Sequence, residues 1–266
     1  MNRPALVALD VDGTILTKDH RVLPEVRRAI QEARDAGVTV ALATARSLPA
    51  MEHVLEDIGG VDAAICFGGA LTLHPTDAPP RATTTLTHDQ ILEIVATARG
   101  LDVSLALYSL REVFVDRLDA RLTHEFMVTG LKGTEADLTK LNAPIIKALA
   151  ISERSDPEGL HVLKNRFGAD MSVVFSHVNF LEIMRSGVSK GHAVAALRDR
   201  LGVAASDVVA IGDSENDLSM FAVAGRAIAM GNAPEAVQMA AHWVTTSCEE
   251  AGVATAIARC RTEIWR

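Results

Sequence analysis

The 266-residue sequence has few cysteines, few aromatic residues and no long apolar run. Three cysteines, none in a Cys-x-x-Cys pair, disfavour a disulfide framework and indicate a reducing compartment, so we expect a cytoplasmic protein. Phe, Trp and Tyr make up only 4% of the chain, which disfavours a base-stacking surface. No apolar run has the length of a membrane-spanning helix, and the apolar stretch 5–9 ends at Asp10, too early for a signal peptide.

Basic blocks and several common ligand motifs are also missing. Lys and Arg number 26 against 34 Asp and Glu, and the formal net charge of −8 would repel a nucleic-acid backbone or an anionic membrane. The nine histidines form no H-x-H or H-E-x-x-H, which disfavours zinc. The sequence has neither G-x-x-x-x-G-K nor G-x-G-x-x-G, so nucleotide sites of those types are not expected.

The two ends of the chain share one alternating pattern of short apolar runs and amphipathic segments. Such alternation predicts a doubly wound, parallel α/β sheet. At the N-terminal end we expect strands at 5–9, 38–43 and 63–67 and helices at 24–36 and 47–58. After Gly187 we expect helices at 189–201, 217–224 and 234–241 and strands at 208–211 and 227–230.

The middle of the chain has a different order. Residues 74–80 read as a proline-rich loop, and the segment that follows mixes adjacent strands with helices. We therefore expect a core domain formed by 1–82 and 186–266, with an α+β cap inserted at 83–185. Its expected strands are 103–108, 113–116, 145–151, 171–175 and 180–184, and its expected helices are 89–98, 119–128 and 157–167.

Acidic residues follow two of the expected core strands. Asp10-Val11-Asp12-Gly13-Thr14 comes directly after the first strand, and Gly212-Asp213-Ser214-Glu215-Asn216-Asp217 follows strand 208–211. Ligands of doubly wound sheets bind beyond the carboxyl ends of the strands, and grouped carboxylates suit a hard cation such as Mg²⁺. An acidic turn after the first strand and a capped helix start at the second are the plain structural alternatives.

Two further segments could bind phosphate. Lys190 stands between Ser189 and Gly191 at an expected helix start, where its ammonium could reach a phosphate oxygen. Thr44-Ala45-Arg46 follows the second strand and offers a hydroxyl donor at another helix start. A solvated lysine and a simple helix cap are the alternatives for the two segments.

The order D-x-D-G-T, Thr, Lys and G-D-x-x-N-D resembles the four motifs of the haloacid dehalogenase superfamily of phosphohydrolases. The inserted segment, together with Leu181-Glu182-Ile183 and Gly187-Val188-Ser189-Lys190-Gly191, resembles its Cof-type branch (subfamily IIB), which includes many sugar-phosphate phosphatases. The resemblance covers the whole chain. It implies a Mg²⁺-dependent phosphatase that acts on a small phosphorylated metabolite, through a Rossmann-like core and a cap that selects the substrate.

The resemblance also implies a role for each motif residue. Asp10 would be the nucleophile that forms an aspartyl-phosphate, and Asp12 would be the general acid and base. Mg²⁺ would be held by the Asp10 carboxylate, the Asp12 backbone carbonyl and Asp213. Asn216 and Asp217 would orient the groups that hold the metal. The phosphoryl oxygens would be bound by Thr44, Arg46 and Lys190.

Two positions depart from the pattern of many relatives. Ala45 stands where many have Gly, and Gly68 stands where many have Asn. The change at Gly68 removes an amide from the neighbourhood of the expected site. A relative's substrate preference therefore does not transfer directly to this chain.

Other readings of the motifs stay open at the level of sequence. Gly187–Gly191 matches G-x-S-x-G and is followed by Asp213 and His242, the order of an α/β-hydrolase triad, but that reading gives no role to Asp10, Asp12 or Asp217. A phospho-accepting signalling module uses similar chemistry, and a phosphomutase of the same superfamily is closer still. The sequence identifies neither the substrate nor the oligomeric state, for which we expect a monomer or a homodimer. Tyr108, Arg111, Arg117 and Arg121 are possible cap contacts.

Overall fold

The computed structural model describes residues 5–74, 84–153 and 155–265. Its contacts divide the chain into two compact units. Unit 1 comprises Met1–Ala45, Glu52–Pro80 and Ser189–Arg266, and unit 2 comprises Arg46–Met51 and Arg81–Val188. Most of the proline-rich loop expected at 74–80 falls in 75–83, outside the described residues.

Unit 1 is built on a seven-stranded sheet with the order β13-β12-β11-β1-β2-β3-β4. Neighbouring strands are parallel except for β3 and β4, which are antiparallel. The prediction of a doubly wound α/β core is confirmed. The strands are β1 (Ala5–Leu9), β2 (Val38–Ala43), β3 (Ala63–Cys66), β4 (Leu71–Leu73), β11 (Val208–Gly212), β12 (Arg226–Ala229) and β13 (Trp243–Val244).

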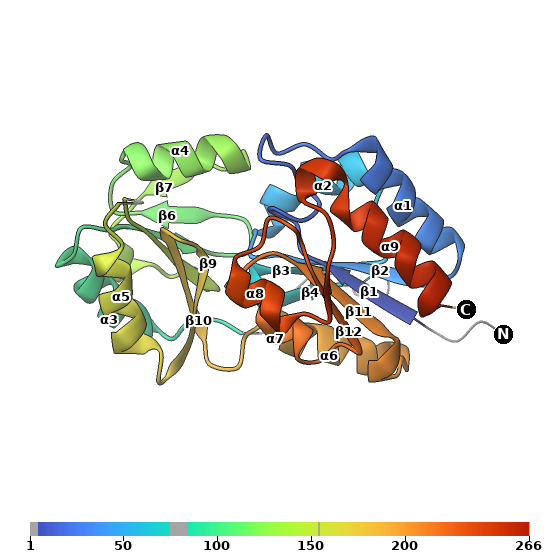
Figure 1. The fold of residues 1–266 in the computed structure, drawn as a ribbon. Coiled ribbons are helices and arrows are strands. Elements are labelled where there is room, and N and C mark those ends of the chain that lie inside the picture. Colours follow the sequence, from blue (N-terminus) through green and yellow to red (C-terminus); the bar gives the residue numbers. More distant parts are fainter. Residues whose placement is uncertain (1–4, 75–83, 154, 266) are drawn as a thin grey trace. The chain divides into compact units, whose positions relative to one another are not determined.

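Helices cover both faces of this sheet, which explains why its central strands are apolar throughout. Figure 1 shows α1 and α9 on one side and α6 and α7 on the other. The helices of unit 1 are α1 (Pro24–Asp35), α6 (Lys190–Leu201), α7 (Leu218–Phe221), α8 (Glu235–Ala240) and α9 (Gly252–Glu263), and α2 (Leu48–Ile58) runs from unit 2 into unit 1. Leu6 and Ala8 of β1 pack in one buried cluster with Val194 and Leu197 of α6.

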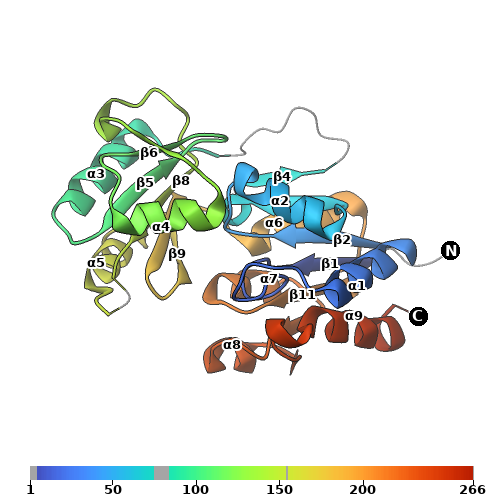
Figure 2. The same ribbon diagram turned by 90° about the horizontal axis from the view of Figure 1, so that it is seen from above.

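Unit 2 has a six-stranded sheet with the order β7-β6-β5-β8-β10-β9. Figure 2 shows it from above, with α4 in front. Leu160 and Leu163 of α5 and Ile94 of α3 are buried with Leu107 and Ala148 of the sheet. The elements are α3 (His88–Arg99), β5 (Ser104–Tyr108), β6 (Val113–Val115), α4 (Ala120–Thr129), β7 (Gly133–Glu135), β8 (Lys147–Ile151), α5 (Glu158–Phe167), β9 (Met171–His177) and β10 (Phe180–Arg185).

Several elements have bounds that the sequence patterns did not indicate. The strands β4, β7 and β13 have two or three residues each, too few to show a period of two. The helix expected at 217–224 is instead a 3₁₀ turn, Glu215–Asp217, followed by the four-residue α7. The sequence patterns do not predict α9, in which Val253, Ile257 and Cys260 are among the buried residues.

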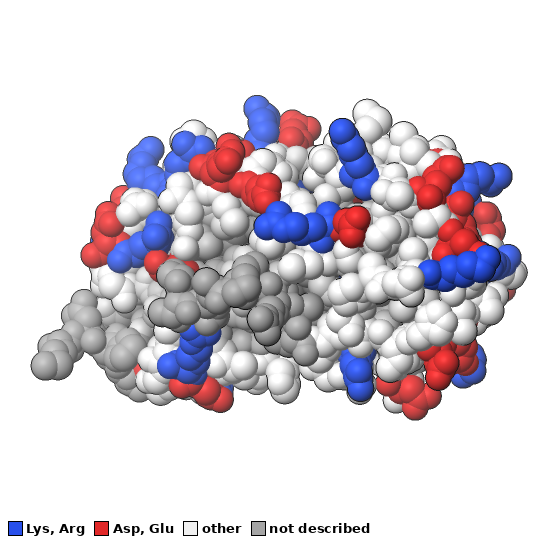
Figure 3. All heavy atoms as spheres, turned by 180° about the vertical axis from the view of Figure 1, so that it is seen from behind, with Lys and Arg blue, Asp and Glu red and all other residues white. Residues whose placement is uncertain are grey.

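The surface carries charges of both signs. On the face shown in Figure 3, basic and acidic side chains of the described residues are interspersed. No helix among the described residues is long and apolar enough to cross a membrane.

The register of β1 places the motif residues at one edge of the sheet. Leu9, the last residue of β1, pairs with Leu42 of β2 and with Ile211 of β11. The backbone N–H of the next residue, Asp10, donates to the Ile211 carbonyl at 2.9 Å. Asp10, Thr44 and Asp213 therefore leave their strands at the same carboxyl edge.

Close packing of α6 on α7 is expected to depend on Gly191. A Cβ atom at Gly191 would lie 2.0 Å from the backbone carbonyl oxygen of Ser219. Gly191→Ala should therefore lower the free energy of unfolding by about 1–3 kcal/mol, because the backbones must move apart. Urea unfolding measures this change.

Gly100→Ala is the matched control. The nearest atom to a Cβ there is 3.5 Å away, an ordinary contact, and Gly100 has a negative φ. This variant should remain within about 0.5 kcal/mol of the wild type. Equal losses in the two variants would contradict the packing role of Gly191.

Candidate active site

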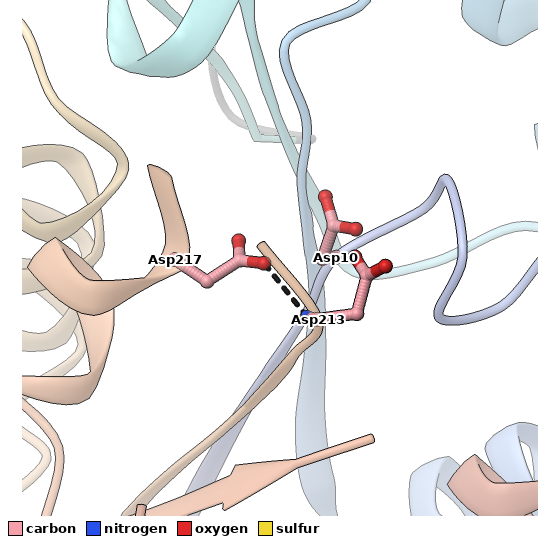
Figure 4. A group of neighbouring side chains, drawn as sticks. All are labelled: Asp10, Asp213 and Asp217. Atoms are coloured by element: carbon pink, nitrogen blue, oxygen red, sulfur yellow. Dashed lines mark hydrogen bonds between the residues drawn. The ribbon is translucent and has the colours of Figure 1, made fainter. Parts of the chain in front are cut away.

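Three carboxylates gather at the carboxyl edge of the unit 1 sheet. Asp10, Asp213 and Asp217 each offer an oxygen, and these oxygens lie within 4.8 Å of one another. Figure 4 shows the carboxylates of Asp10 and Asp213 side by side, with Asp217 reaching toward the backbone of Asp213. Asp10 and Asp217 are buried and Asp213 is partly buried, so the cluster is largely shielded from water.

Lys190 lies among these carboxylates. Its Nζ donates to Asp10 Oδ1 at 2.5 Å and to Asp217 Oδ1 at 2.7 Å. The side chain is only 1% exposed, at the start of α6 directly after the N-cap Ser189. Lys190 is thus held as a buried ammonium rather than a solvated surface lysine.

Asp217 is saturated by donors from the chain itself. Its Oδ2 accepts from the N–H groups of Asp213 and Ser214, both at 2.9 Å, and from Ser214 Oγ at 3.2 Å. Its Oδ1 accepts from Lys190. With both oxygens engaged, Asp217 is suited to hold the loop and the lysine in place.

The charges in the cluster do not balance. Burial, followed by the charge of Asp217, raises the pKa of Asp10 to about 7 despite the opposing effect of Lys190. Burial, followed by the charges of Asp10 and Asp217, raises the pKa of Asp213 to about 8. Burial works to lower the pKa of Lys190, but the two carboxylates outweigh it and raise that pKa above its usual range. Three carboxylates against one ammonium favour an additional cation.

Asp213 has an oxygen available for such a cation. Its Oδ1 is buried and accepts no hydrogen bond within the structure. The carboxylate lies so close to Gly13 that a Cβ there would be 2.3 Å from Asp213 Oδ2. A glycine is therefore required at this point of the D-x-D-G-T loop. Buried carboxylate oxygens with an unsatisfied acceptor are the donor set that Mg²⁺ prefers, so the residues present fit this metal.

Asp12 lies apart from the carboxylate cluster. Its side chain is 48% exposed, and its Oδ1 is 4.0 Å from Nδ1 of His20. An exposed carboxyl group on the loop after β1 can exchange protons with a reacting group or with water. This placement differs in kind from that of Asp10, which is buried.

The other expected site residues occupy different environments. Thr44 is buried in unit 1, where its N–H donates to the Ile65 carbonyl. Arg46 belongs to unit 2 and donates to the carbonyl of Ala50 at 3.4 Å. Asn216 accepts from Ser214 Oγ at 2.9 Å, within the loop after β11. A phosphate contact for Thr44 or Arg46 stays a prediction.

The departure at Gly68 has a conformational explanation. Gly68 has φ 60° and ψ 16°, in the left-handed region that glycine adopts freely and that asparagine tolerates better than most residues. The backbone is thus compatible with either residue. The exchange removes an amide side chain without changing the turn.

The structure disfavours a serine triad at Gly187–Gly191. Ser189 Oγ accepts from the N–H of His192 as the N-cap of α6. Nδ1 of His242 accepts from the N–H of Ala227 at 3.0 Å, a backbone contact beside β12. Each side chain has a structural partner elsewhere.

The sequence patterns did not predict a role for two groups of polar residues. Asn232 contacts the site from a loop after β12, and Lys147 pairs with Glu182 inside unit 2. Lys147 Nζ is 3.1 Å from Glu182 Oε1, and both side chains are 4% exposed. The available signal was a charged residue beside apolar ones in each strand, Lys147 in β8 and Glu182 in β10. Of the possible cap contacts, Arg121 is held in ion pairs with Asp102 and Glu153.

The chain is similar to known hydrolases over nearly its whole length. The family described as haloacid dehalogenase-like hydrolase matches residues 7–257. A Streptococcus pyogenes serotype M6 protein, provisionally named a phosphatase, is 31% identical over 95% of this chain and 96% of its own. The 5-amino-6-(5-phospho-D-ribitylamino)uracil phosphatase of Bacillus subtilis is 28% identical, with coverage of 95% and 96%.

Solved structures agree with this similarity. A haloacid dehalogenase-like hydrolase from Bacteroides thetaiotaomicron superposes with a TM-score of 0.83 at 26% identity, covering 97% of this chain and 99% of that one. The chain therefore belongs to the haloacid dehalogenase-like hydrolase family, in its Cof-type branch, and is a phosphoric monoester hydrolase.

Proposed function

We propose that the protein is a Mg²⁺-dependent phosphatase that hydrolyses a small phosphomonoester, with a sugar or polyol phosphate as its substrate class. The observation that carries this proposal is the buried cluster of Asp10, Asp213 and Asp217 around Lys190. In the relative from Bacillus subtilis, the name places the phosphate on a ribityl chain, which is a polyol. A cytoplasmic location and a monomeric or homodimeric state stay predictions.

Mg²⁺ fits the donor set described above. The Asp10 carboxylate, the Asp12 backbone carbonyl and Asp213 would hold it, and when bound it neutralises the charge of the incoming phosphate. Asp217 and Asn216 would keep the loop after β11 in place. Of the three ammonium donors of Lys190, two serve Asp10 and Asp217, so the third is assigned to a phosphoryl oxygen together with Thr44 and Arg46.

The proposed reaction has two steps. A carboxylate oxygen of Asp10 attacks phosphorus, and the bond from phosphorus to the ester oxygen breaks as Asp12 gives its proton to the leaving alkoxide. Water then attacks the aspartyl-phosphate while Asp12 takes the proton back, which releases inorganic phosphate and restores Asp10. The buried position of Asp10 and the exposed position of Asp12 suit these separate roles.

A phosphatase of this kind should release inorganic phosphate from an aryl phosphate and from members of a panel of pentose, hexose and pentitol phosphates. Activity should disappear in EDTA and return with Mg²⁺. Ca²⁺ should support it poorly, because Ca²⁺ takes more ligands at longer distances than Mg²⁺. Full activity with Ca²⁺ alone would contradict the proposed site. A strict need for a sugar bisphosphate would favour a phosphomutase, and a single phosphorylation without turnover would favour a signalling module.

Asp12→Asn should slow substrates with poor leaving groups far more than substrates with good ones, because only the former need the proton in the transition state. The expected loss of kcat/KM is about 10²–10⁴-fold for an alkyl phosphate and much smaller for p-nitrophenyl phosphate. Steady-state kinetics on the two substrates measures the difference.

Asp10→Asn is the matched comparison. Without its nucleophile the enzyme should lose several orders of magnitude in kcat on both substrates alike. An equal loss of kcat/KM for the two substrates in Asp12→Asn would contradict the role of Asp12 as general acid. If Asp10→Asn keeps more than a tenth of the wild-type kcat, Asp10 is not the nucleophile.

We assign to unit 2 the role of the substrate-selecting cap expected at 83–185. Its buried Lys147–Glu182 pair lies opposite the face packed by α3 and α5, since Ala148 and Ile183, the adjacent residues, pack there. Glu182 Oε2 is buried and has no hydrogen-bond partner in the part of the chain that the structure describes, and Lys147 Nζ is 4.9 Å from the centre of the Tyr108 ring. A hydroxyl group of a polyol would supply the missing donor.

The double variant Lys147→Met and Glu182→Gln tests this role. Neutral replacement of a buried ion pair is often neutral or stabilising, so the fold should persist. The expected result is at least a tenfold fall in kcat/KM for the preferred sugar or polyol phosphate, with p-nitrophenyl phosphate hydrolysis nearly unchanged. The control is Arg99→Met with Asp116→Asn, an exposed pair in the same unit. If the ratio of kcat/KM for the two substrates is the same in the wild type and in both double variants, the selecting role is contradicted.

A further inference from the structure

Asn232 links three separate segments of unit 1. Its Nδ2 donates to the Gly13 carbonyl at 2.8 Å and to Asp213 Oδ2 at 3.3 Å. Its Oδ1 accepts from the N–H of Cys248 at 2.9 Å. The loop after β1, the loop after β11 and the 3₁₀ turn Cys248–Glu250 therefore meet at one amide.

The chemistry of these contacts fixes the orientation of the amide. A backbone N–H is only a donor, so the Cys248 contact requires the carboxamide oxygen on that side. A carbonyl and a carboxylate are only acceptors, so the other two contacts require the NH₂ group. All three contacts agree on one orientation. An amide at position 232 is consistent with every contact, whereas a carboxyl group or an aliphatic side chain is not.

Because of these contacts, the two carboxylate oxygens of Asp213 have different surroundings. Oδ2 lies against Gly13 and accepts from Asn232, while Oδ1 is buried with no hydrogen bond. A carboxylate held through one oxygen presents the other in a defined direction. The same NH₂ group holds the Gly13 carbonyl, next to Asp12, so both sides of the candidate metal site are positioned together.

We propose that Asn232 is a positioning residue for the metal site: its amide holds Asp213 and the Asp12–Gly13 loop in the arrangement that receives Mg²⁺. This inference rests on the proposed function. Groups that orient carboxylate ligands typically contribute about 10- to 100-fold to metal affinity. Asn232 is itself solvent-exposed, so its replacement need not disturb the buried core.

The chain offers a matched control in Gln238. Its Nε2 donates to the carbonyls of Gly231 and Ala233, the two neighbours of Asn232, at 3.3 Å and 2.8 Å. Gln238 thus supports the same loop through an amide, and both of these hydrogen bonds go to backbone carbonyls rather than to the carboxylate cluster. Loss of loop support alone would appear in Gln238→Ala as strongly as in a variant of Asn232.

The experiment compares Asn232→Leu, which keeps the size but lacks both hydrogen-bonding groups, with Gln238→Ala and the wild type. Isothermal titration with Mg²⁺ is carried out on each protein without substrate, and thermal unfolding is recorded in EDTA. We expect Asn232→Leu to bind Mg²⁺ about 10- to 100-fold more weakly. We expect Gln238→Ala to bind it within twofold of the wild type and both variants to remain folded.

Each other outcome overturns the inference in a distinguishable way. Equal weakening in the two variants would assign Asn232 to loop support alone. Unchanged affinity in Asn232→Leu, with normal Mg²⁺ binding by the wild type, would overturn the positioning role and leave the proposed function intact. A wild type that binds no Mg²⁺ would overturn both. If Asn232→Leu proves unfolded, Asn232→Ser takes its place, with the same expected loss of affinity.

Discussion

The crowding of three carboxylates around one buried ammonium is the constraint on which the rest of unit 1 depends. Asp10 and the loop that carries Asp213 and Asp217 are more than 200 residues apart in the sequence, and Lys190 reaches them from a third segment. Burying unpaired charge costs several kcal/mol per ion, so such a cluster persists only where the surrounding fold imposes it. The parallel sheet does so, because β1 and β11 are neighbours and end at the same edge.

Backbone contacts, more than side-chain packing, set the positions within the cluster. Gly191 lets α6 approach α7 closely, which places Lys190 at the sheet edge, and Gly13 lets the loop after β1 approach Asp213. Asp217 uses both oxygens to hold its own loop and the lysine. The result is a site in which one carboxylate oxygen, Asp213 Oδ1, accepts no hydrogen bond from the described residues. That incomplete pairing is the observation that supports the proposed cation site.

The sequence predicted the core well because its strands are buried on both faces and are therefore continuously apolar, as in β1 and β2. Asp10 and Asp213 then follow from their places directly after such strands. Short edge strands such as β13 carry no periodic signal. Asn232 could not be predicted, because a contact with Gly13, 219 residues away, depends on tertiary structure. The Lys147–Glu182 pair escaped for the same reason, since opposite charges on strands reveal no partner before β8 and β10 are known to be neighbours.

The two units differ in the kind of ligand that their buried charges would accept. The unit 1 cluster has an excess of negative charge, so it favours a cation, and a bound cation in turn favours a phosphate dianion. The buried pair of unit 2 has equal numbers of opposite charges and one acceptor oxygen left over, so it favours a neutral donor such as a hydroxyl group. These two preferences, each taken from one unit alone, are the electrostatic basis on which a sugar or polyol phosphate is proposed as the substrate class.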